Sequence, residues 1–200
     1  MTSMTQAGLD HFERLYSASD DPWRVRESWY EQRKRALILA ALPLKHYRNA
    51  YEPGCGNGEL SAALAQRCAR LLASDASPAA VALTEKRLSG PGEASVEQHV
   101  LPRDWPAPER GPFDLIVVSE LAYYLGQDGF DQLQSRILAS LAPEGTLVFC
   151  HWRHPFDDRL QGTEALHDAM TALPALAHAL HHRETDFLLD IWTRAPGEAA

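Results

Sequence analysis

Residues 51–59 read Tyr-Glu-Pro-Gly-Cys-Gly-Asn-Gly-Glu, and Asp75 ends the apolar stretch that follows. Three alternating glycines stand between an expected strand and an expected helix: Gly54, Gly56 and Gly58. Because glycine has no Cβ atom, such a loop can turn tightly and approach a ligand, which suits a nucleoside-type cofactor. A dinucleotide fingerprint would place a further glycine at position 59, but Glu59 stands there, which weakens an NAD interpretation.

The acidic residues around this loop favour a cofactor that carries positive charge. Glu52 stands just before the glycines, where its carboxylate can meet a sulfonium or amino group, as in S-adenosyl-L-methionine. Asp75, nineteen residues after Gly56, is placed to accept hydrogen bonds from ribose hydroxyls. The alternative is a tight glycine turn whose acids are merely solvated. We expect S-adenosyl-L-methionine as the cofactor and S-adenosyl-L-homocysteine as its product. The further expected contacts are Gly54, Cys55, Gly56, Gly58 and Ala76.

The composition fits one globular domain, residues 1–200, with a sizeable core, since 45% of the residues are hydrophobic. We expect a helical lid or substrate segment over residues 1–46 and a Rossmann-like core over residues 47–194. The formal net charge of −8 argues against a nucleic-acid partner, because no basic stripe is present to neutralise phosphates.

The cysteines and the first residues indicate the cellular compartment. Cys55, Cys68 and Cys150 are odd in number and lack metal-ligand spacing, as is typical of reduced cytosolic thiols. The start of the chain lacks the basic and apolar regions of a signal peptide, and no apolar run is long enough to span a bilayer. The sequence therefore predicts a soluble, cytoplasmic monomer or weak homodimer, with no bound metal and no membrane partner.

Strand-like and helix-like runs alternate after residue 47. The expected strands cover residues 48–52, 71–75, 95–100, 113–120 and 145–151, and the expected helices cover residues 59–68, 77–88 and 130–141. The tail departs from this alternation, because residues 176–182 and 186–193 read as the two strands of a hairpin. The pattern predicts an α/β fold: a Rossmann-like, doubly wound, mostly parallel seven-stranded sheet that ends in an antiparallel hairpin.

The segment before the first strand is rich in aromatic and basic groups. Ser28 and Glu31 match a capping box, which predicts a helix that continues to Leu42. Trp29 and Arg33 share a face of that helix, and such a face can cover the cofactor and wall a substrate cavity. The alternative is that the tryptophans are buried anchors and the cations are solvated. From this segment we expect Trp23, Trp29 and Arg33 to contact the cofactor.

The ends of the fourth and fifth strands are expected to carry the acceptor side of the site. Ligands of open α/β sheets bind outside the carboxyl ends of the strands, where Ser119, Glu120 and Tyr124 stand. An amine attacks only when neutral, so a carboxylate can hold it while a histidine takes up its proton. His151 is the best-placed histidine, although a buried histidine bonded to backbone would look the same. We expect Glu120, Tyr124 and His151 to be catalytic and Ser119 to contact the cofactor.

The glycine loop and Asp75 together resemble the first two motifs of class I, Rossmann-like, S-adenosylmethionine-dependent methyltransferases. In that class an acidic residue often follows the third strand and meets the adenine amino group. Residues 98–102 read Gln-His-Val-Leu-Pro instead. Backbone groups near Val100 and Leu101 are therefore expected to contact the adenine.

A larger set of motifs resembles the nodulation protein S (NodS) family over residues 11–194. They are residues 21–23 (Asp-Pro-Trp), 29–34 (Trp-Tyr-Glu-Gln-Arg-Lys), 52–55 (Glu-Pro-Gly-Cys), 113–117 (Phe-Asp-Leu-Ile-Val), 119–120 with 123–125, and 151–153 (His-Trp-Arg). The resemblance implies an N-methyltransferase of nodulation-type oligosaccharide biosynthesis, whose acceptor is the deacetylated, non-reducing glucosamine of a chitooligosaccharide. Methylation of oxygen or nitrogen in another small metabolite is the alternative. An alternative of another class is a cofactor-binding regulatory module without catalysis.

Overall fold

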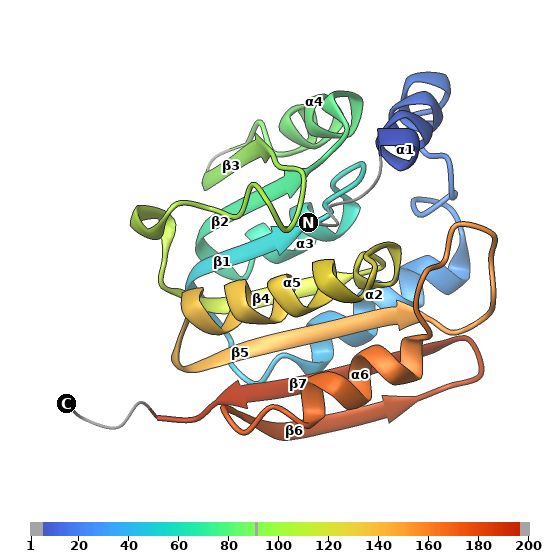
Figure 1. Cartoon of the computed structure of the whole chain (residues 1–200). Coiled ribbons are helices and arrows are strands. Elements are labelled where there is room, and N and C mark those ends of the chain that lie inside the picture. The colour runs from blue at the N-terminus through green and yellow to red at the C-terminus, as the bar shows by residue number, and fades with distance from the viewer. Residues whose placement is uncertain (1–5, 91, 197–200) are drawn as a thin grey trace.

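The computed structural model describes residues 6–90 and 92–196, and within them the chain forms a seven-stranded sheet in the order β3-β2-β1-β4-β5-β7-β6 (Figure 1). Strand β7 is antiparallel to both of its neighbours, and the other strands are parallel to one another. The strands are β1 (Tyr47–Pro53), β2 (Cys68–Asp75), β3 (Glu93–Gln98), β4 (Phe113–Ser119), β5 (Leu141–Trp152), β6 (Leu176–Arg183) and β7 (Phe187–Arg194). The predicted doubly wound sheet with its C-terminal hairpin is confirmed.

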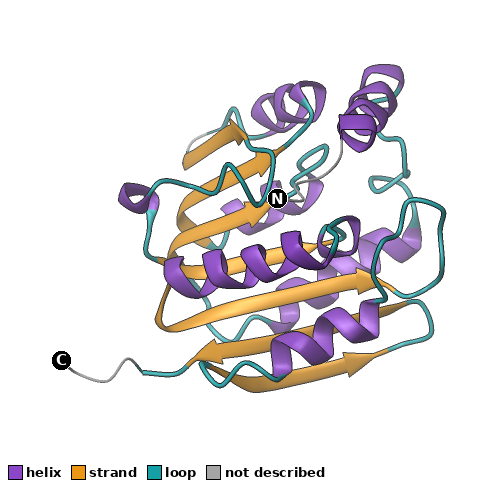
Figure 2. Cartoon of the chain, viewed as in Figure 1, coloured by secondary structure: helices purple, strands orange, loops and turns teal. Residues whose placement is uncertain are grey.

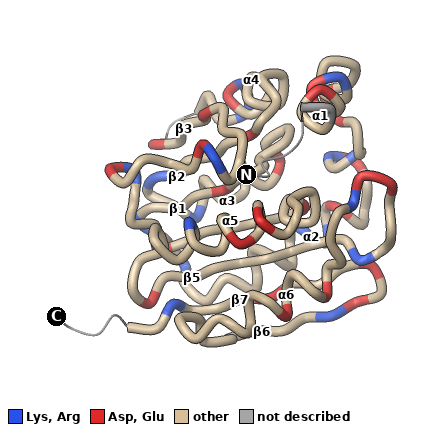
Figure 3. Tube along the Cα trace, in the orientation of Figure 1, with Lys and Arg blue, Asp and Glu red and all other residues tan. Residues whose placement is uncertain are grey.

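Helices cover both faces of the sheet (Figure 2). They are α1 (Gln6–Ala18), α2 (Trp29–Ala41), α3 (Glu59–Ala65), α4 (Pro78–Arg87), α5 (Gln127–Ser140) and α6 (Thr163–Thr171), with short 3₁₀ turns η1 (Pro108–Arg110) and η2 (Ala122–Tyr124). No helix among the described residues is long and apolar enough to cross a bilayer. Acidic and basic residues are spread over all layers of the fold (Figure 3).

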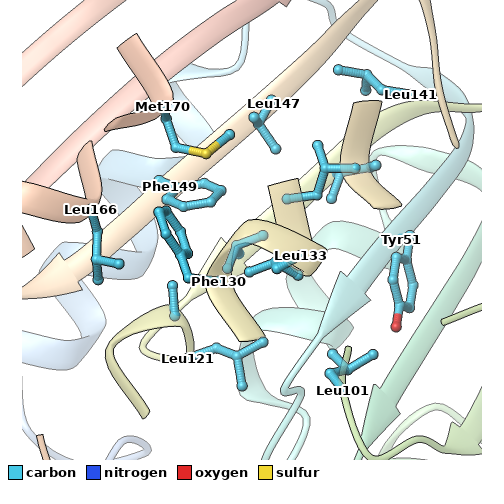
Figure 4. Packing of buried hydrophobic residues seen from close by; sticks show 14 of the residues in the cluster. Tyr51, Leu101, Leu121, Phe130, Leu133, Leu141, Leu147, Phe149, Leu166 and Met170 are labelled. Atoms are coloured by element: carbon cyan, nitrogen blue, oxygen red, sulfur yellow. The ribbon is translucent and has the colours of Figure 1, made fainter. Parts of the chain in front are cut away.

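The core consists of two layers, one on each face of the sheet. Strand β4 contributes to both layers, because successive side chains of a strand point to opposite faces. Ile116 and Val118 pack with α5 and α6, while Leu115 and Val117 pack with α2 and α3. Figure 4 shows the first layer, in which Phe130 of α5 lies beside Phe149 of β5, and both are fully buried (Figure 4).

The order of the strands creates a switch point between β1 and β4. From β1 the chain proceeds outward to β2 and β3, then returns to β4 on the other side of β1 and continues to β5. At such a point the connections leave the sheet in opposite directions, and a crevice opens at the carboxyl ends of the two strands. Helix α1 lies at this edge, beyond α4 (Figure 1).

Several boundaries differ from those expected. Helix α3 ends at Ala65 and β2 begins at Cys68, three residues before the predicted start, because the guanidinium of Arg67 donates to the carbonyl oxygens of Leu44 and Lys45 and fixes the turn between them. Strand β3 runs over Glu93–Gln98, two residues earlier than predicted, since it pairs along β2 up to Asp75.

The N-terminal and C-terminal thirds contain features that the sequence pattern did not locate. Helices α1 and α6 were not predicted. Ser28 does precede α2, but its side chain makes no capping hydrogen bond, and Glu31 binds Lys34 instead. The predicted capping box is therefore wrong, although the helix it was used to place is present.

Candidate active site

The glycine loop after β1 has the conformation that its sequence requires. Gly54, Gly56 and Gly58 all have positive φ angles, of 74°, 57° and 79°. A Cβ atom on Gly56 would lie 2.5 Å from the hydroxyl of Tyr16, and one on Gly58 would lie 3.1 Å from the Cα atom of Thr84. Side chains at these positions would be strained and crowded, so the loop keeps its backbone open toward the crevice.

Two carboxylates flank the loop. Asp75, at the end of β2, accepts the Gly56 and Ser77 amide N–H groups, each at 3.0 Å. Glu52 is 2% exposed, and its Oε2 atom has no hydrogen-bond partner among the described residues. Burial raises the pKa of Glu52 to about 8, an effect that the nearby Ser61 hydroxyl partly offsets. A buried carboxylate oxygen without a donor is costly, so this site fits a ligand that brings a positively charged donor.

A cavity of about 650 Å³ opens at the switch point. Eleven of the predicted site residues line it: Trp23, Glu52, Gly54, Cys55, Gly56, Asp75, Ala76, Leu101, Ser119, Glu120 and Tyr124. The glycine loop after β1 and the residues that follow β4 both line this cavity, and a Cβ atom on Gly54 would lie 3.3 Å from the side chain of Leu121. The volume is within the range of small-molecule sites.

Helix α1 and the segment after it cover the cavity. Tyr16 and Phe12 of α1 line it and each contacts Trp23 edge-on or at a tilt, with ring centroids 5.4 and 6.2 Å apart. The Glu13 carboxylate accepts the Ser77 hydroxyl at 2.6 Å, which ties α1 to the start of α4. The N-terminal segment therefore borders the cavity, and α1, which was not predicted, contributes Phe12 and Tyr16 to the lining beside Trp23.

The part of the cavity that follows β4 is organised around Glu120, whose backbone has a φ of 55°. One carboxylate oxygen accepts the Lys34 ammonium at 2.6 Å. The other accepts the Tyr123 hydroxyl at 2.5 Å and the Trp152 amide N–H at 2.9 Å. Three donors hold this carboxylate in one orientation at the end of β4.

Lys34 and Glu31 complete this network and were not predicted as site residues. The Lys34 ammonium also donates to Glu31 at 2.9 Å, and both side chains line the cavity. Burial disfavours the charged form of Lys34, but the carboxylates of Glu120 and Glu31 outweigh it and hold the pKa of the ammonium above its usual range. Burial raises the pKa of Glu31, with Lys34 in partial opposition.

His151 has a different place from the one expected. It is fully buried and outside the cavity lining. Its Nε2 atom accepts the Ala122 amide N–H at 3.2 Å, and its Nδ1 atom lies 3.1 Å from Nε2 of His167. Burial holds the pKa of His151 far below its usual range, so the ring stays neutral. The structure corrects the prediction that His151 takes up a proton from the acceptor.

Four predicted cofactor contacts also lie outside the cavity lining. Trp29 is 73% exposed. Arg33 forms a two-pronged ion pair with Glu184, at 2.6 and 2.7 Å, in the turn between β6 and β7. Gly58 caps the start of α3, and the Val100 amide donates to Asp104 rather than toward the crevice. Of the adenine contacts expected after β3, Leu101 alone borders the cavity in the described part of the chain.

Comparison with known proteins places this chain in a family. The family model described as nodulation protein S (NodS) matches residues 5–173. The chain belongs to the NodS family of S-adenosylmethionine-dependent methyltransferases. Nodulation protein S of Rhizobium tropici is 37% identical over 135 residues, which cover 66% of this chain and 55% of that relative. Nodulation protein S of Sinorhizobium fredii is 33% identical over 149 residues, which cover 74% of this chain and 68% of that relative.

Solved structures agree with this assignment. The NodS N-methyltransferase of Bradyrhizobium japonicum WM9, in complex with S-adenosyl-L-homocysteine, matches with a TM-score of 0.80 and 26% identity over 93% of this chain and 97% of that chain. A Pseudomonas syringae protein assigned as a methyltransferase shares 47% identity, with a TM-score of 0.74 over 84% of this chain and 100% of that chain. The predicted cofactor is confirmed by the family and by the NodS complex.

Proposed function

We propose that this NodS family member transfers the methyl group of S-adenosylmethionine to the nitrogen of an amino sugar, such as a deacetylated chitooligosaccharide. The observation that carries the proposal is the charged network in the part of the cavity that follows β4. Glu31 and Glu120 share the single ammonium of Lys34 there, at 2.9 and 2.6 Å. Two carboxylates and one ammonium leave one negative charge, which attracts a cationic amine in a partly buried site.

The cofactor site is supplied by the loop and the carboxylates around it. Glu52 would hold the positively charged amino-acid end of the cofactor, and Asp75 its ribose hydroxyls. When bound, S-adenosylmethionine supplies a methyl group that its sulfonium already activates. The contribution of the protein is therefore mainly to position the acceptor nitrogen in line with that group.

The acceptor amine must lose a proton before it attacks. Glu120 already accepts three hydrogen bonds, so it suits the holding and orientation of the amine. Glu31 has Lys34 as its partner and a pKa raised by burial, so it is the better-placed proton acceptor. Tyr124, Trp152 and Phe156 line the same cavity and offer flat apolar faces to a sugar ring.

A hydroxyl acceptor would need stronger base assistance. His151, which was expected to take up the proton of an amine, lies outside the cavity, and a hydroxyl would depend on such a base more than an amine does, which favours nitrogen over oxygen as the acceptor. A regulatory module without catalysis would have no need of a carboxylate held by three donors beside the cofactor. One methylation screen distinguishes the proposed N-methylation from O-methylation and from a module without catalysis.

The proposal is tested by a methylation screen of the purified protein with S-adenosylmethionine and mass detection of the product. Glucosamine and deacetylated chitooligosaccharides are expected to gain a methyl group, and their N-acetylated counterparts are not. Glu31→Gln and Glu120→Gln are each expected to lower turnover by about 10²-fold, the scale of a lost general base or positioned carboxylate. Glu27→Gln, an exposed residue outside the cavity lining, is the matched control. Methylation of alcohols alone, or full activity of both variants, would overturn the proposal.

A further inference from the structure

A second cluster of ionisable side chains lies on the C-terminal hairpin, outside the cavity lining. Asp190 of β7 has a side chain that is 2% exposed, and one of its oxygens, Oδ1, faces two histidines of β6. His178 Nε2 is 2.7 Å from this oxygen and His181 Nδ1 is 2.8 Å from it. The methyl-transfer site described above uses none of these three residues.

A β-bulge brings the two histidines to the same face of the sheet. Residues three apart in a regular strand point to opposite faces, since side chains alternate. Strand β6 has an irregularity between His178 and Leu180, so that His178 lies opposite Trp192 and His181 lies opposite Asp190. Bulges often re-aim side chains at functional sites. Here the extra residue places both imidazoles on the face that carries Asp190.

The His178 ring and the Asp190 carboxylate are both held in place by neighbouring side chains. The ring of His178 stacks on Trp192, with centroids 5.3 Å apart and an angle of 20° between the planes. The second oxygen of Asp190, Oδ2, binds His167 Nδ1 at 2.6 Å. Because His151 accepts a backbone N–H through Nε2, a neutral His151 donates from Nδ1 to His167, and a neutral His167 then donates from its own Nδ1 to Asp190. This chain of donors fixes the carboxylate through Oδ2 and leaves Oδ1 directed at His178 and His181.

We propose that His178, His181 and Asp190 bind a divalent transition-metal ion of the zinc class. Two imidazole nitrogens and one carboxylate oxygen are ligands that zinc prefers, and the three atoms lie within 4.8 Å of one another. Ligand atoms around a tetrahedral zinc ion are roughly 3.3 Å apart, so the oxygen and each nitrogen need to separate by about half an ångström, and the two nitrogens, which lie within 4.8 Å of each other, need to reach the same spacing by rotation of the partly exposed imidazoles. Each imidazole becomes a ligand by moving its proton to the other ring nitrogen. The partial exposure of His178 and His181 leaves the fourth position to water.

The experiment is a calorimetric titration of the full chain, free of any affinity tag, with Zn²⁺. One ion per chain is expected to bind with a dissociation constant tighter than about 100 μM, and Mg²⁺ is not expected to bind because it selects oxygen ligands. His178→Ala and His181→Ala are each expected to weaken Zn²⁺ binding by at least ~10-fold. His182→Ala is the matched control, since His182 is the next residue along β6 and its ring binds Glu184 instead.

Folding of each variant is checked by far-ultraviolet circular dichroism and by its affinity for S-adenosyl-L-homocysteine, since the three ligand residues lie outside the cavity lining. His181 is half exposed, so His181→Ala is expected to fold even if His178→Ala, which also loses the stack on Trp192, does not. Absence of Zn²⁺ binding, or binding weaker than the stated limit, would show that the cluster only satisfies the buried carboxylate. Equal affinity in wild type and His181→Ala would also overturn the proposal.

Discussion

Glu52 illustrates how a single side chain prepares the cofactor site. Its carboxyl group is buried, and one of its oxygens lacks a donor among the described residues. Burial raises its pKa from 4.5 to about 8, so the ligand-free protein retains a proton at neutral pH that the unfolded chain releases. The contribution of Glu52 to the free energy of unfolding is therefore fully present below about pH 4.5 and is lost as the pH rises toward 8. The residue therefore favours ligand binding at the expense of stability.

Glu52→Gln is expected to separate these two effects. Without a titrating group, the melting temperature of the ligand-free variant declines less between pH 5 and 8 than that of wild type. S-adenosyl-L-homocysteine binds the variant more weakly by ~1 to 3 kcal/mol, the cost of losing a charged hydrogen-bond partner. Thermal melts across this pH range and calorimetry measure the two quantities. A variant with the pH dependence and the affinity of wild type would show that Glu52 has neither role.

Residues next to the glycines could be predicted from the sequence because the loop is local. Glu52, Gly54, Gly56 and Asp75 lie at the ends of strands that their own apolar runs specify. The network of Glu31, Lys34 and Glu120 could not be predicted in the same way. Lys34 and Glu120 are far apart in the chain, and their contact depends on how α2 packs against the end of β4. The burial of His151 likewise depends on α6, a helix that was not anticipated.

At the scale of elements, α1 and the segment that follows it decide how the cavity is covered. Trp23 and Trp29 lie six residues apart and looked equivalent in sequence. Trp23 is 44% exposed but lines the cavity and packs against Tyr16, whereas Trp29 is 73% exposed and lies outside the lining. The two tryptophans differ in local structure, because Trp23 lies in a turn closed by the Arg24 amide donating to the Asp21 carbonyl, while Trp29 is the first residue of α2.

Trp23→Ala is expected to weaken S-adenosyl-L-homocysteine binding by about 1 kcal/mol, roughly fivefold, through loss of its aromatic contacts. Trp29→Ala is the matched control, and its affinity is expected to equal that of wild type. Calorimetry at one pH and salt concentration compares the two. Equal effects of both substitutions would mean that the N-terminal segment does not cover the cofactor as described.

The strands were easier to predict than the helices at the ends of the chain. Strand β4 is a continuous apolar run, and its predicted limits differ from the observed ones by one residue. Helix α6 begins after Gly162 without a side-chain cap, and its buried face is interrupted by His167. Such a helix is stabilised mainly by its packing against the sheet. Because it lacks a capping residue and an uninterrupted apolar face, its sequence gives little indication that a helix forms there.

At the scale of the whole molecule, the switch point between β1 and β4 brings the glycine loop and the charged network of Glu31, Lys34 and Glu120 into one cavity. The glycine loop follows β1 and the charged network follows β4, and these strands are direct neighbours. The topology was predictable from the alternation of strands and helices, and it places the cofactor and acceptor sides next to each other. The identity of the acceptor depends on side-chain geometry in one part of the cavity, which the topology leaves open.

The position of the transferred methyl group distinguishes an amine acceptor from a hydroxyl acceptor. S-adenosylmethionine labelled with ¹³C in its methyl group is incubated with the protein and a deacetylated chitooligosaccharide, and the product is examined by NMR. We expect one labelled methyl group on nitrogen, with a rate that increases with pH as the bound amine loses its proton. A methyl group on oxygen, or no transfer to any amine by a protein that binds S-adenosyl-L-homocysteine, would contradict this expectation.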